Sequence, residues 1–197
     1  DYPIVLEYLF NTLKIKSLDS VMHSGGGICL TIFLATYPEY VPKFNRVVFF
    51  GSQAFGAAYN PKNYVKTLLG KSLSALLGYT PAKSFGRPHN ENHFFMKQWY
   101  EWNLTKKFIG MNGIDYEKEM PKITIPILSI CGKGDNYIAP KEGCELYLNA
   151  FQNPKNKLLF CSLENGFKED YNHSRLLQSR NSRAEIWPIV TDWLKQK

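Results

Sequence analysis

Short apolar runs that lack polar–apolar alternation constrain the fold of this chain more than any other feature. Three such runs occupy residues 46–50 (RVVFF), 123–131 (ITIPILSIC) and 157–162 (KLLFCS), and a shorter strand-like run occupies 17–22 (SLDSVM). A run without alternation is typical of a strand that is buried on both faces. Helical patterns separate the runs, and this order predicts a mostly parallel sheet between two layers of helices. We therefore expect a three-layer α/β/α fold.

The helical patterns have recognisable ends. Apolar residues at helical spacing predict a helix over 3–14, and a long apolar helix follows a run of three glycines and closes near Pro38. The last helix is expected to begin at a capping box, Ser182-Arg-Ala-Glu185. Pro188 falls inside that helix and predicts a kink or a later start.

The segment 53–120 is too long for a simple crossover between two strands. It contains helical patterns near 61–77 and 91–103, separated by glycine and proline. This arrangement predicts a helical cap, or lid, inserted over the sheet. The core domain would then consist of 1–52 and 121–197.

Composition excludes several classes of protein. Hydrophobic residues make up 44% of the 197 residues, which excludes a disordered chain, and no apolar stretch is long enough for a transmembrane helix. The net charge is +7, but there is no Lys/Arg cluster of the nucleic-acid-binding kind, so we expect no nucleic-acid partner. Neither a phosphate-binding glycine motif nor metal-ligand spacing is present, so no cofactor and no metal are expected.

Four cysteines stand without any CxxC pair: Cys29, Cys131, Cys144 and Cys161. Their places in apolar runs favour buried free thiols over a disulfide framework. We therefore expect a reducing compartment and a cytoplasmic location.

The sharpest motif is the turn between the strand-like run 17–22 and the following apolar helix, Met22-His23-Ser24-Gly25-Gly26. A serine on a tight strand-to-helix turn projects its hydroxyl above the sheet edge, where the helix N-terminus favours developing negative charge. The alternative is a glycine-rich turn with an ordinary N-cap serine.

Two further loops follow strand-like runs and carry complementary chemistry. Asp135 follows the run 123–131, and His173 follows the run 157–162. Because parallel strands gather such loops at one edge, Ser24, Asp135 and His173 are expected to meet there. The histidine would take the serine proton, and the aspartate would hold the histidine tautomer.

Other histidines and acids are alternatives in less suitable positions. His23 adjoins the serine, so its ring should point away from it and a packing role is favoured, although substrate contact stays open. His89 and His93 lie in the cap, where surface or substrate contact is open. The rival acids cluster after the last strand-like run: Glu164, Glu169 and Asp170.

These features together resemble the α/β-hydrolase superfamily, over essentially the whole chain. The serine elbow lies at 22–26, the cap at 53–120, the acid follows ITIPILSICGKGD at 123–135, and the cap helix MKQWYEW at 96–102 looks like that of little-characterised bacterial members. The resemblance implies that Ser24 is the nucleophile, Asp135 the acid and His173 the base. It also implies that the backbone N–H of Gly25 is an oxyanion donor.

By the same resemblance, the chain is expected to be a serine hydrolase that cleaves a small-molecule ester or thioester through an acyl-enzyme. The alternatives are another activity on the same fold, such as acyl transfer or peptide hydrolysis, and a non-catalytic interaction module.

The sequence departs from the family at two points. Met22 stands where the usual G-x-S-x-G elbow has its first glycine. The family also has strands before the elbow, with a loop that supplies a second oxyanion donor. We therefore expect an N-terminal segment of the same domain as a further partner, covering the edge of the strand at 17–22.

The composition of the cap indicates which kind of substrate or surface it would contact. Its nine basic and five acidic residues give it a net charge of +4, which favours an anionic acyl substrate or contact with an anionic lipid surface. Trp99 and Trp102 are candidate substrate contacts in this segment. The alternative is that the aromatic residues are core and the lysines face water.

Overall fold

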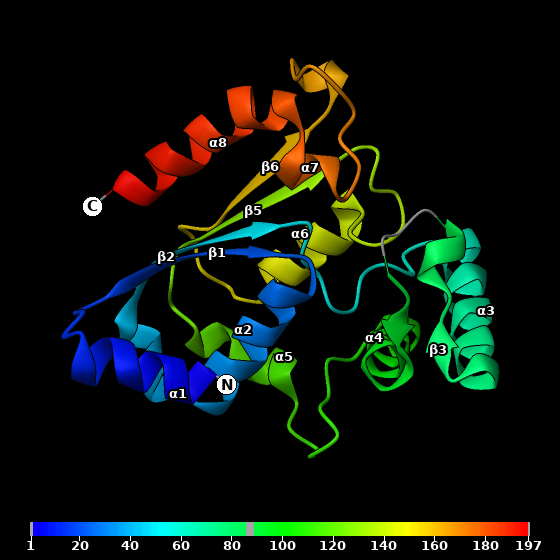
Figure 1. Ribbon diagram of the computed structural model, residues 1–197, viewed down its shortest axis with the longest axis horizontal. Coiled ribbons are helices and arrows are strands. Elements are labelled where there is room, and N and C mark those ends of the chain that lie inside the picture. Colours follow the sequence, from blue (N-terminus) through cyan, green and yellow to red (C-terminus); the bar gives the residue numbers. More distant parts are fainter. Residues whose placement is uncertain (1, 86–88, 197) are drawn as a thin grey trace.

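The computed structural model describes residues 2–85 and 89–196 and contains a four-stranded sheet with the order β1-β2-β5-β6. Its strands are β1 (Leu18–His23), β2 (Phe44–Phe50), β5 (Ile127–Gly132) and β6 (Lys157–Cys161). All three pairings are parallel, so their carboxyl ends share one edge (Figure 1). The expected parallel sheet is confirmed. The strand expected from 123 begins only at Ile127.

Helices cover both faces of this sheet. Figure 1 shows α8 (Arg180–Lys195) on one face and both α2 (Gly25–Thr36) and α6 (Lys141–Asn149) on the other. The remaining short elements are α1 (Tyr2–Glu7), the π-helical η1 (Tyr8–Thr12), the 3-10 helices η2 (Pro38–Lys43) and η5 (Leu163–Asn165), and α7 (Arg175–Gln178). The three-layer α/β/α architecture is therefore as expected.

Strand β2 shows why the central runs lack alternation. Val48 and Phe50 pack in the cluster beneath α8, whereas Val47 and Phe49 pack in the cluster on the opposite face. All four side chains are at most 2% exposed. A strand buried on both faces needs apolar residues at consecutive positions.

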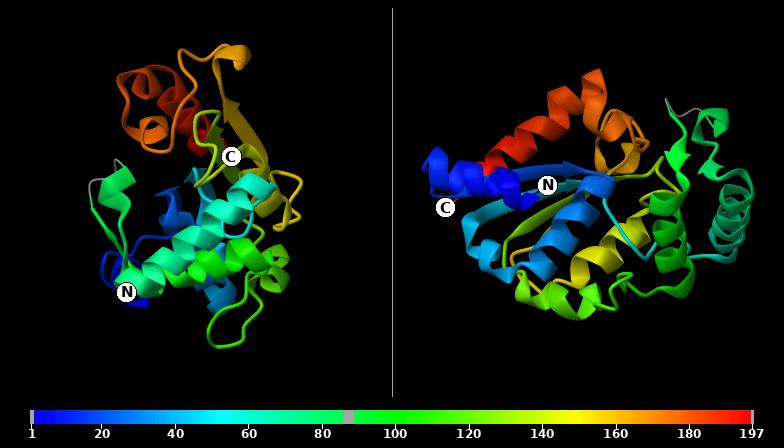
Figure 2. Two further views of the ribbon diagram at one scale, coloured as in Figure 1. Left: turned by 90° about the vertical axis from the view of Figure 1, so that its right-hand side faces the viewer. Right: turned by 60° about the horizontal axis from the view of Figure 1, so that its bottom comes forward.

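The long insertion between β2 and β5 is helical. Its elements are α3 (Pro61–Leu77), β3 (Tyr79–Thr80), the 3-10 helix η3 (Ala82–Phe85), β4 (Glu91–Asn92), α4 (His93–Thr105), α5 (Tyr116–Glu119) and the 3-10 helix η4 (Met120–Lys122). Figure 2 shows α3 and α4 beyond the carboxyl ends of the strands, with α4 between α3 and the rest of the molecule. Phe55 and Phe108 of this insertion share a core cluster with Phe49.

The start of the last helix differs from the expectation. The N-cap of α8 is Ser179, whose side chain accepts the backbone N–H of Ser182, and the helix continues through Pro188. Ser182 donates its hydroxyl to the carbonyl of Leu176 instead of capping. The carboxylate of Glu185 binds elsewhere, so the expected capping box is not formed.

The expectation of buried thiols was wrong at one position. Cys131, Cys144 and Cys161 are fully buried free thiols, but Cys29 is exposed on α2. Within the described residues, no helix is long and apolar enough to span a membrane.

Candidate active site

Ser24 lies at the turn between β1 and α2 in an unusual backbone conformation. Its φ is 55° and its ψ is −125°, and its backbone N–H donates to the carbonyl of Phe50 at 2.9 Å. A positive φ in a non-glycine residue stores strain that the surrounding structure must support. The helix begins at the next residue, so the serine hydroxyl stands at its N-terminus.

A continuous series of hydrogen bonds links this serine to the other two expected residues. The distance from Ser24 Oγ to His173 Nε2 is 2.8 Å, and the distance from His173 Nδ1 to Asp135 Oδ2 is 2.5 Å. A carboxylate only accepts, so Nδ1 carries the proton and Nε2 accepts from the serine. His173 and Asp135 are 6% and 5% exposed. The structure therefore brings Ser24, His173 and Asp135 together. The histidine is in the tautomer whose Nε2 can accept a proton from the serine.

The carboxylate of Asp135 is held in place on both sides. Its second oxygen, Oδ1, accepts the backbone N–H groups of Ile138 and Ala139 at 3.1 and 3.2 Å. With Oδ1 held by the backbone, Oδ2 faces the imidazole. This arrangement fixes the orientation of the histidine ring.

The loop that bears Asp135 packs closely against the loop that bears His173. The backbone N–H of Gly134 donates to the carbonyl of Tyr171 at 3.0 Å. A Cβ atom on Gly132 would lie 2.2 Å from the same carbonyl oxygen. Only glycine permits this approach, which explains the Gly132-Lys133-Gly134 sequence.

Sequence reasoning missed Gly51, which follows β2 directly. Its φ is +55°, and a Cβ atom there would lie 3.1 Å from His173 Nδ1. The glycine thus leaves room for the imidazole beside Asp135. The sequence signal that could have identified this position is a glycine directly after a buried strand.

The elbow accommodates Met22 without its first glycine. The methionine sulfur would lie 3.6 Å from a Cβ atom on Gly26 and also accepts a contact from the Tyr2 hydroxyl at 3.8 Å. A Cβ atom on Gly27 would lie 2.6 Å from the Ser52 hydroxyl, so this glycine lets α2 approach the loop after β2.

Two aromatic side chains frame the serine. His23 does not point away from the site: its Nε2 lies 3.2 Å from the carbonyl oxygen of His173, and the two rings have centroids 4.8 Å apart. Phe95 of α4, which sequence reasoning also missed, lies 3.2 Å from the position of a Cβ on Gly25. Phe95 is 51% exposed, so it stands between solvent and the elbow.

The other candidate residues take structural positions. Trp99 and Trp102 are 6% and 7% exposed in the main core cluster, and the Trp102 indole donates to the carbonyl of Ile109. These positions favour packing for both tryptophans. The rival acids have other partners: Glu164 pairs with Lys133, Glu169 with Arg175, and Asp170 accepts the backbone N–H of Leu163.

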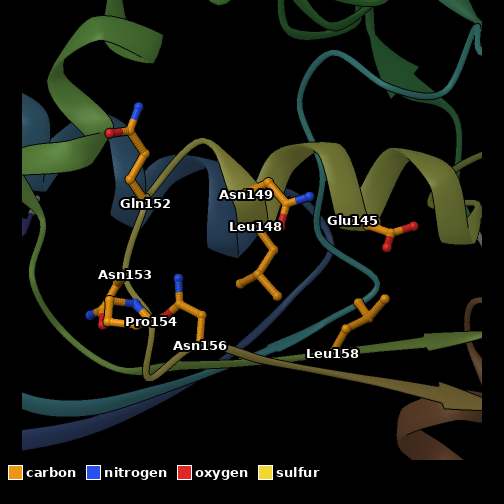
Figure 3. A pocket seen from close by; sticks show the side chains of 8 residues that line it. All are labelled: Glu145, Leu148, Asn149, Gln152, Asn153, Pro154, Asn156 and Leu158. Atoms are coloured by element: carbon orange, nitrogen blue, oxygen red, sulfur yellow. The ribbon is translucent and has the colours of Figure 1, made fainter.

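Two surface hollows lie near the sheet. One of about 350 Å³ is lined by the end of α6 and the start of β6, with Leu148, Asn156 and Leu158 among its residues (Figure 3). Because the four strands of the main sheet are parallel, this hollow at the start of β6 lies at the edge opposite Ser24. A second, of about 270 Å³, is lined in part by Asp135. Ser24 and His173 line neither.

The buried thiols are unsuited to act as nucleophiles. Contact with the Cys131 thiol, together with burial, raises the pKa of Cys144, and burial raises the pKa of Cys161. Only the thiolate is strongly nucleophilic. Within residues 2–85 and 89–196, no group of three or more His, Cys, Asp or Glu side chains is placed to hold a metal ion.

The arrangement has the parts that acyl transfer needs. Ser24 is a hydroxyl within reach of a base, His173, whose other nitrogen is held by an acid. The first backbone N–H groups of α2, including that of Gly25, have no acceptor within the helix, so they are available to stabilise negative charge that develops near the serine.

Several solved structures have a fold similar to that of this chain. A monoacylglycerol lipase from Paleococcus ferrophilus is 16% identical, with a TM-score of 0.60 over 97% of this chain and 72% of the lipase. The mouse alpha/beta hydrolase domain-containing protein 10 is 17% identical, with a TM-score of 0.57 over 98% of this chain and 68% of that one. An enol-lactonase from Burkholderia xenovorans is 20% identical, with a TM-score of 0.51 over 98% and 71%. No family model and no curated protein sequence matches the chain.

Proposed function

We propose that this chain, which has the α/β-hydrolase fold, is a serine hydrolase that cleaves an ester or thioester of a small acyl substrate. The observation that carries the proposal is the series of two hydrogen bonds from Ser24 through His173 to Asp135. A chance surface cluster seldom combines a strained nucleophile turn, a base at 2.8 Å and a buried acid that fixes the tautomer of the base.

Each residue has a role in the proposed reaction. His173 Nε2 takes the proton of Ser24 as Oγ attacks the acyl carbonyl, and the tetrahedral oxyanion accepts the backbone N–H of Gly25. His173 then gives the proton to the departing alcohol or thiol, which leaves an acyl-enzyme. Water, deprotonated by His173, releases the acid in the second half of the cycle. Asp135 stabilises the imidazolium throughout.

The surroundings support a small acyl substrate. The lipase and the lactonase among the structural neighbours act on ester bonds, which favours esters over peptides. In this proposal residues 53–120 are a cap over the site, and Phe95 is the cap side chain beside the nucleophile. The buried free thiols favour a reducing compartment such as the cytoplasm.

Covalent labelling with a fluorophosphonate tests the proposal. We expect the protein to be labelled, Ser24→Ala to abolish labelling, and Ser72→Ala on the exposed face of α3 to leave it unchanged. Absence of labelling in the wild-type protein would favour the interaction-module alternative. Persistent labelling of Ser24→Ala would place the nucleophile elsewhere.

Kinetics then separate hydrolysis from acyl transfer. An activated ester should give a burst of one leaving group per protein, followed by slower turnover as water attacks the acyl-enzyme. If an added alcohol or amine takes up most of the acyl group instead of water, the acyltransferase alternative is correct. Matched ester and thioester substrates with the same acyl chain identify the preferred leaving group through kcat/KM.

A further inference from the structure

Helix α3 buries its small and polar residues and exposes its large apolar ones. The residues on its inner face are small or polar: Asn63, Thr67 and Ser74 are at most 5% exposed, with Gly70 between them. The exposed face carries large aliphatic residues instead. We call it the leucine face, and it consists of Val65, Leu68, Leu69, Leu73 and Leu76.

The spacing of the leucine face is that of one continuous stripe. Val65, Leu69, Leu73 and Leu76 follow one another at intervals of three or four residues, and Leu68 lies beside Leu69, which places all five on one side of a helix. Exposure reaches 64% at Leu69 and 82% at Leu76. Single exposed leucines are ordinary, but a contiguous apolar stripe on a surface helix marks a site of interaction.

Polar contacts hold α3 in this orientation. The side-chain amide of Asn63 donates to the carbonyl oxygens of Ala57 and Asn136 at 3.0 and 2.9 Å. Near the other end, the hydroxyl of Ser74 lies 3.0 Å from Nδ1 of His93. Rotating the helix to bury its leucines would break these contacts and leave buried polar groups unpaired.

Close packing with α4 reinforces the orientation. A Cβ atom on Gly70 would lie 3.1 Å from the Tyr100 hydroxyl, so the two helices approach at a point where a leucine side chain does not fit. Figures 1 and 2 show α3 as the outermost helix beyond α4. The leucine face therefore points away from the body of the protein.

Charge decides which occupant fits this face. Helix α3 has no acidic residue and three lysines: Lys62 is exposed, Lys66 lies over the Tyr137 ring, and Lys71 pairs with Glu101. The whole insertion has a net charge of +4. Pairing the leucine face with a second copy of itself would bring two positively charged insertions together and cost electrostatic energy. An anionic lipid surface offers both an apolar layer for the leucines and phosphates for the lysines.

We propose that α3 lies flat on anionic lipid surfaces, with the leucine face of Val65, Leu68, Leu69, Leu73 and Leu76 immersed among the acyl chains. The exposed Lys62 beside the stripe then extends toward the headgroups, as basic side chains at membrane interfaces do. This is a binding property, and it does not depend on the chemistry of Ser24. A negative result in the labelling test would therefore leave the lipid proposal standing, and a negative result in the lipid test would leave the proposed function standing.

Flotation with vesicles tests the proposal. We expect the protein to float with vesicles that contain phosphatidylglycerol and to bind vesicles of phosphatidylcholine alone much more weakly. Raising the salt to about 1 M, where the Debye length falls to about 3 Å, should also weaken binding. The double variant Leu69→Gln with Leu76→Gln should lower the partition coefficient at least about tenfold, because it removes the two most exposed apolar side chains of the leucine face.

A matched double variant distinguishes binding through the leucine face from nonspecific hydrophobic adsorption. Leu163→Gln with Met111→Gln removes two side chains of 58% and 89% exposure from segments outside α3, and it should bind vesicles as the wild type does. Equal loss in both double variants, or binding that ignores lipid charge, overturns the proposal. So does concentration-dependent dimerisation that Leu69→Gln with Leu76→Gln abolishes while vesicles remain unbound.

Discussion

The Nε2 atom of His23 lies 3.2 Å from the backbone carbonyl oxygen of His173. The two residues are 150 positions apart in the sequence: His23 is the last residue of β1, and His173 lies in the turn before α7. Because the carbonyl oxygen accepts, His23 donates. Asp135 holds the side chain of His173, and His23 thus holds its backbone, so the base is fixed at two points.

We expect His23 to be a positioning residue. His23→Ala should lower kcat about tenfold with KM nearly unchanged, because a small displacement of the base slows proton transfer without altering substrate contacts. His23→Gln, which retains an N–H donor, should recover part of the loss. His89→Ala is the control, since His89 is an exposed insertion residue. A change in KM alone would instead assign His23 to substrate binding.

The acid can be tested without changing the shape of its side chain. Asp135→Asn should lower kcat on the order of 10³- to 10⁴-fold, because the amide N–H₂ opposes the tautomer in which Nε2 accepts from Ser24. Asp170→Asn is the matched control, because Asp170 binds the backbone of Leu163 and should retain activity. Equal rates for Asp135→Asn and the wild type would remove Asp135 from the mechanism.

Close approach of two loops makes Gly132 sensitive. Gly132→Ala would place a Cβ atom 2.2 Å from the carbonyl oxygen of Tyr171, so the loop of His173 must move. We expect kcat to fall at least about tenfold, measured on folded protein. Gly78→Ala is the control: it meets no neighbour within 4 Å and has a φ of 74°, so it should cost about 1 kcal/mol of stability and leave kcat unchanged. Full activity of Gly132→Ala would show that the two loops move apart freely.

The sheet and the meeting of Ser24, His173 and Asp135 at one edge were predictable because their signals are local. Buried strands require consecutive apolar residues, as in β2, and the elbow requires small residues after Ser24. The order of Ser24, Asp135 and His173 along the chain then sufficed to place them at one edge, since parallel strands share it. Boundaries were less accurate, because Ser179 and Ser182 are both competent caps and only the packing of α8 selects the first.

Features set by tertiary packing were not predictable. The pattern near 61–77 predicted a helix, but which face of α3 is buried depends on α4, whose Tyr100 requires Gly70 opposite it. Cys29 sits in an apolar helix yet falls on its exposed side. His23 was expected to point away from the serine, and only the position of the His173 loop turns it into a partner.

The ring of Phe95 lies beside the turn that bears Ser24. Phe95→Ala should raise kcat/KM for long or branched acyl chains relative to acetyl by about tenfold, because it removes the side chain 3.2 Å from the Cβ position of Gly25. Phe94→Ala is the matched control, since Phe94 is the neighbouring residue and is 78% exposed. An unchanged ratio of long to short substrates in Phe95→Ala would place the acyl group on the other side of Ser24.

The hydroxyl of Tyr171 connects the His173 loop to the last helix. Tyr171 is fully buried and donates to the carboxylate of Glu185, which also accepts the backbone N–H of Lys168 at 2.9 Å. Burial, together with this carboxylate, raises the pKa of Tyr171, so the phenol remains a donor over the physiological pH range. Tyr171→Phe should lower the free energy of unfolding by about 1–3 kcal/mol, because Glu185 loses its side-chain partner.

Urea or thermal unfolding measures this effect, and each kcal/mol should lower Tm by about 2–4 °C in a chain of this size. Activity of folded Tyr171→Phe should stay near that of the wild type, because the contacts with Gly132 and Gly134 use the backbone of Tyr171 and not its hydroxyl. Tyr79→Phe, at an exposed position, should leave stability unchanged. If Tyr171→Phe unfolds like the wild type but loses activity, the hydroxyl orders the His173 loop instead of stabilising the fold.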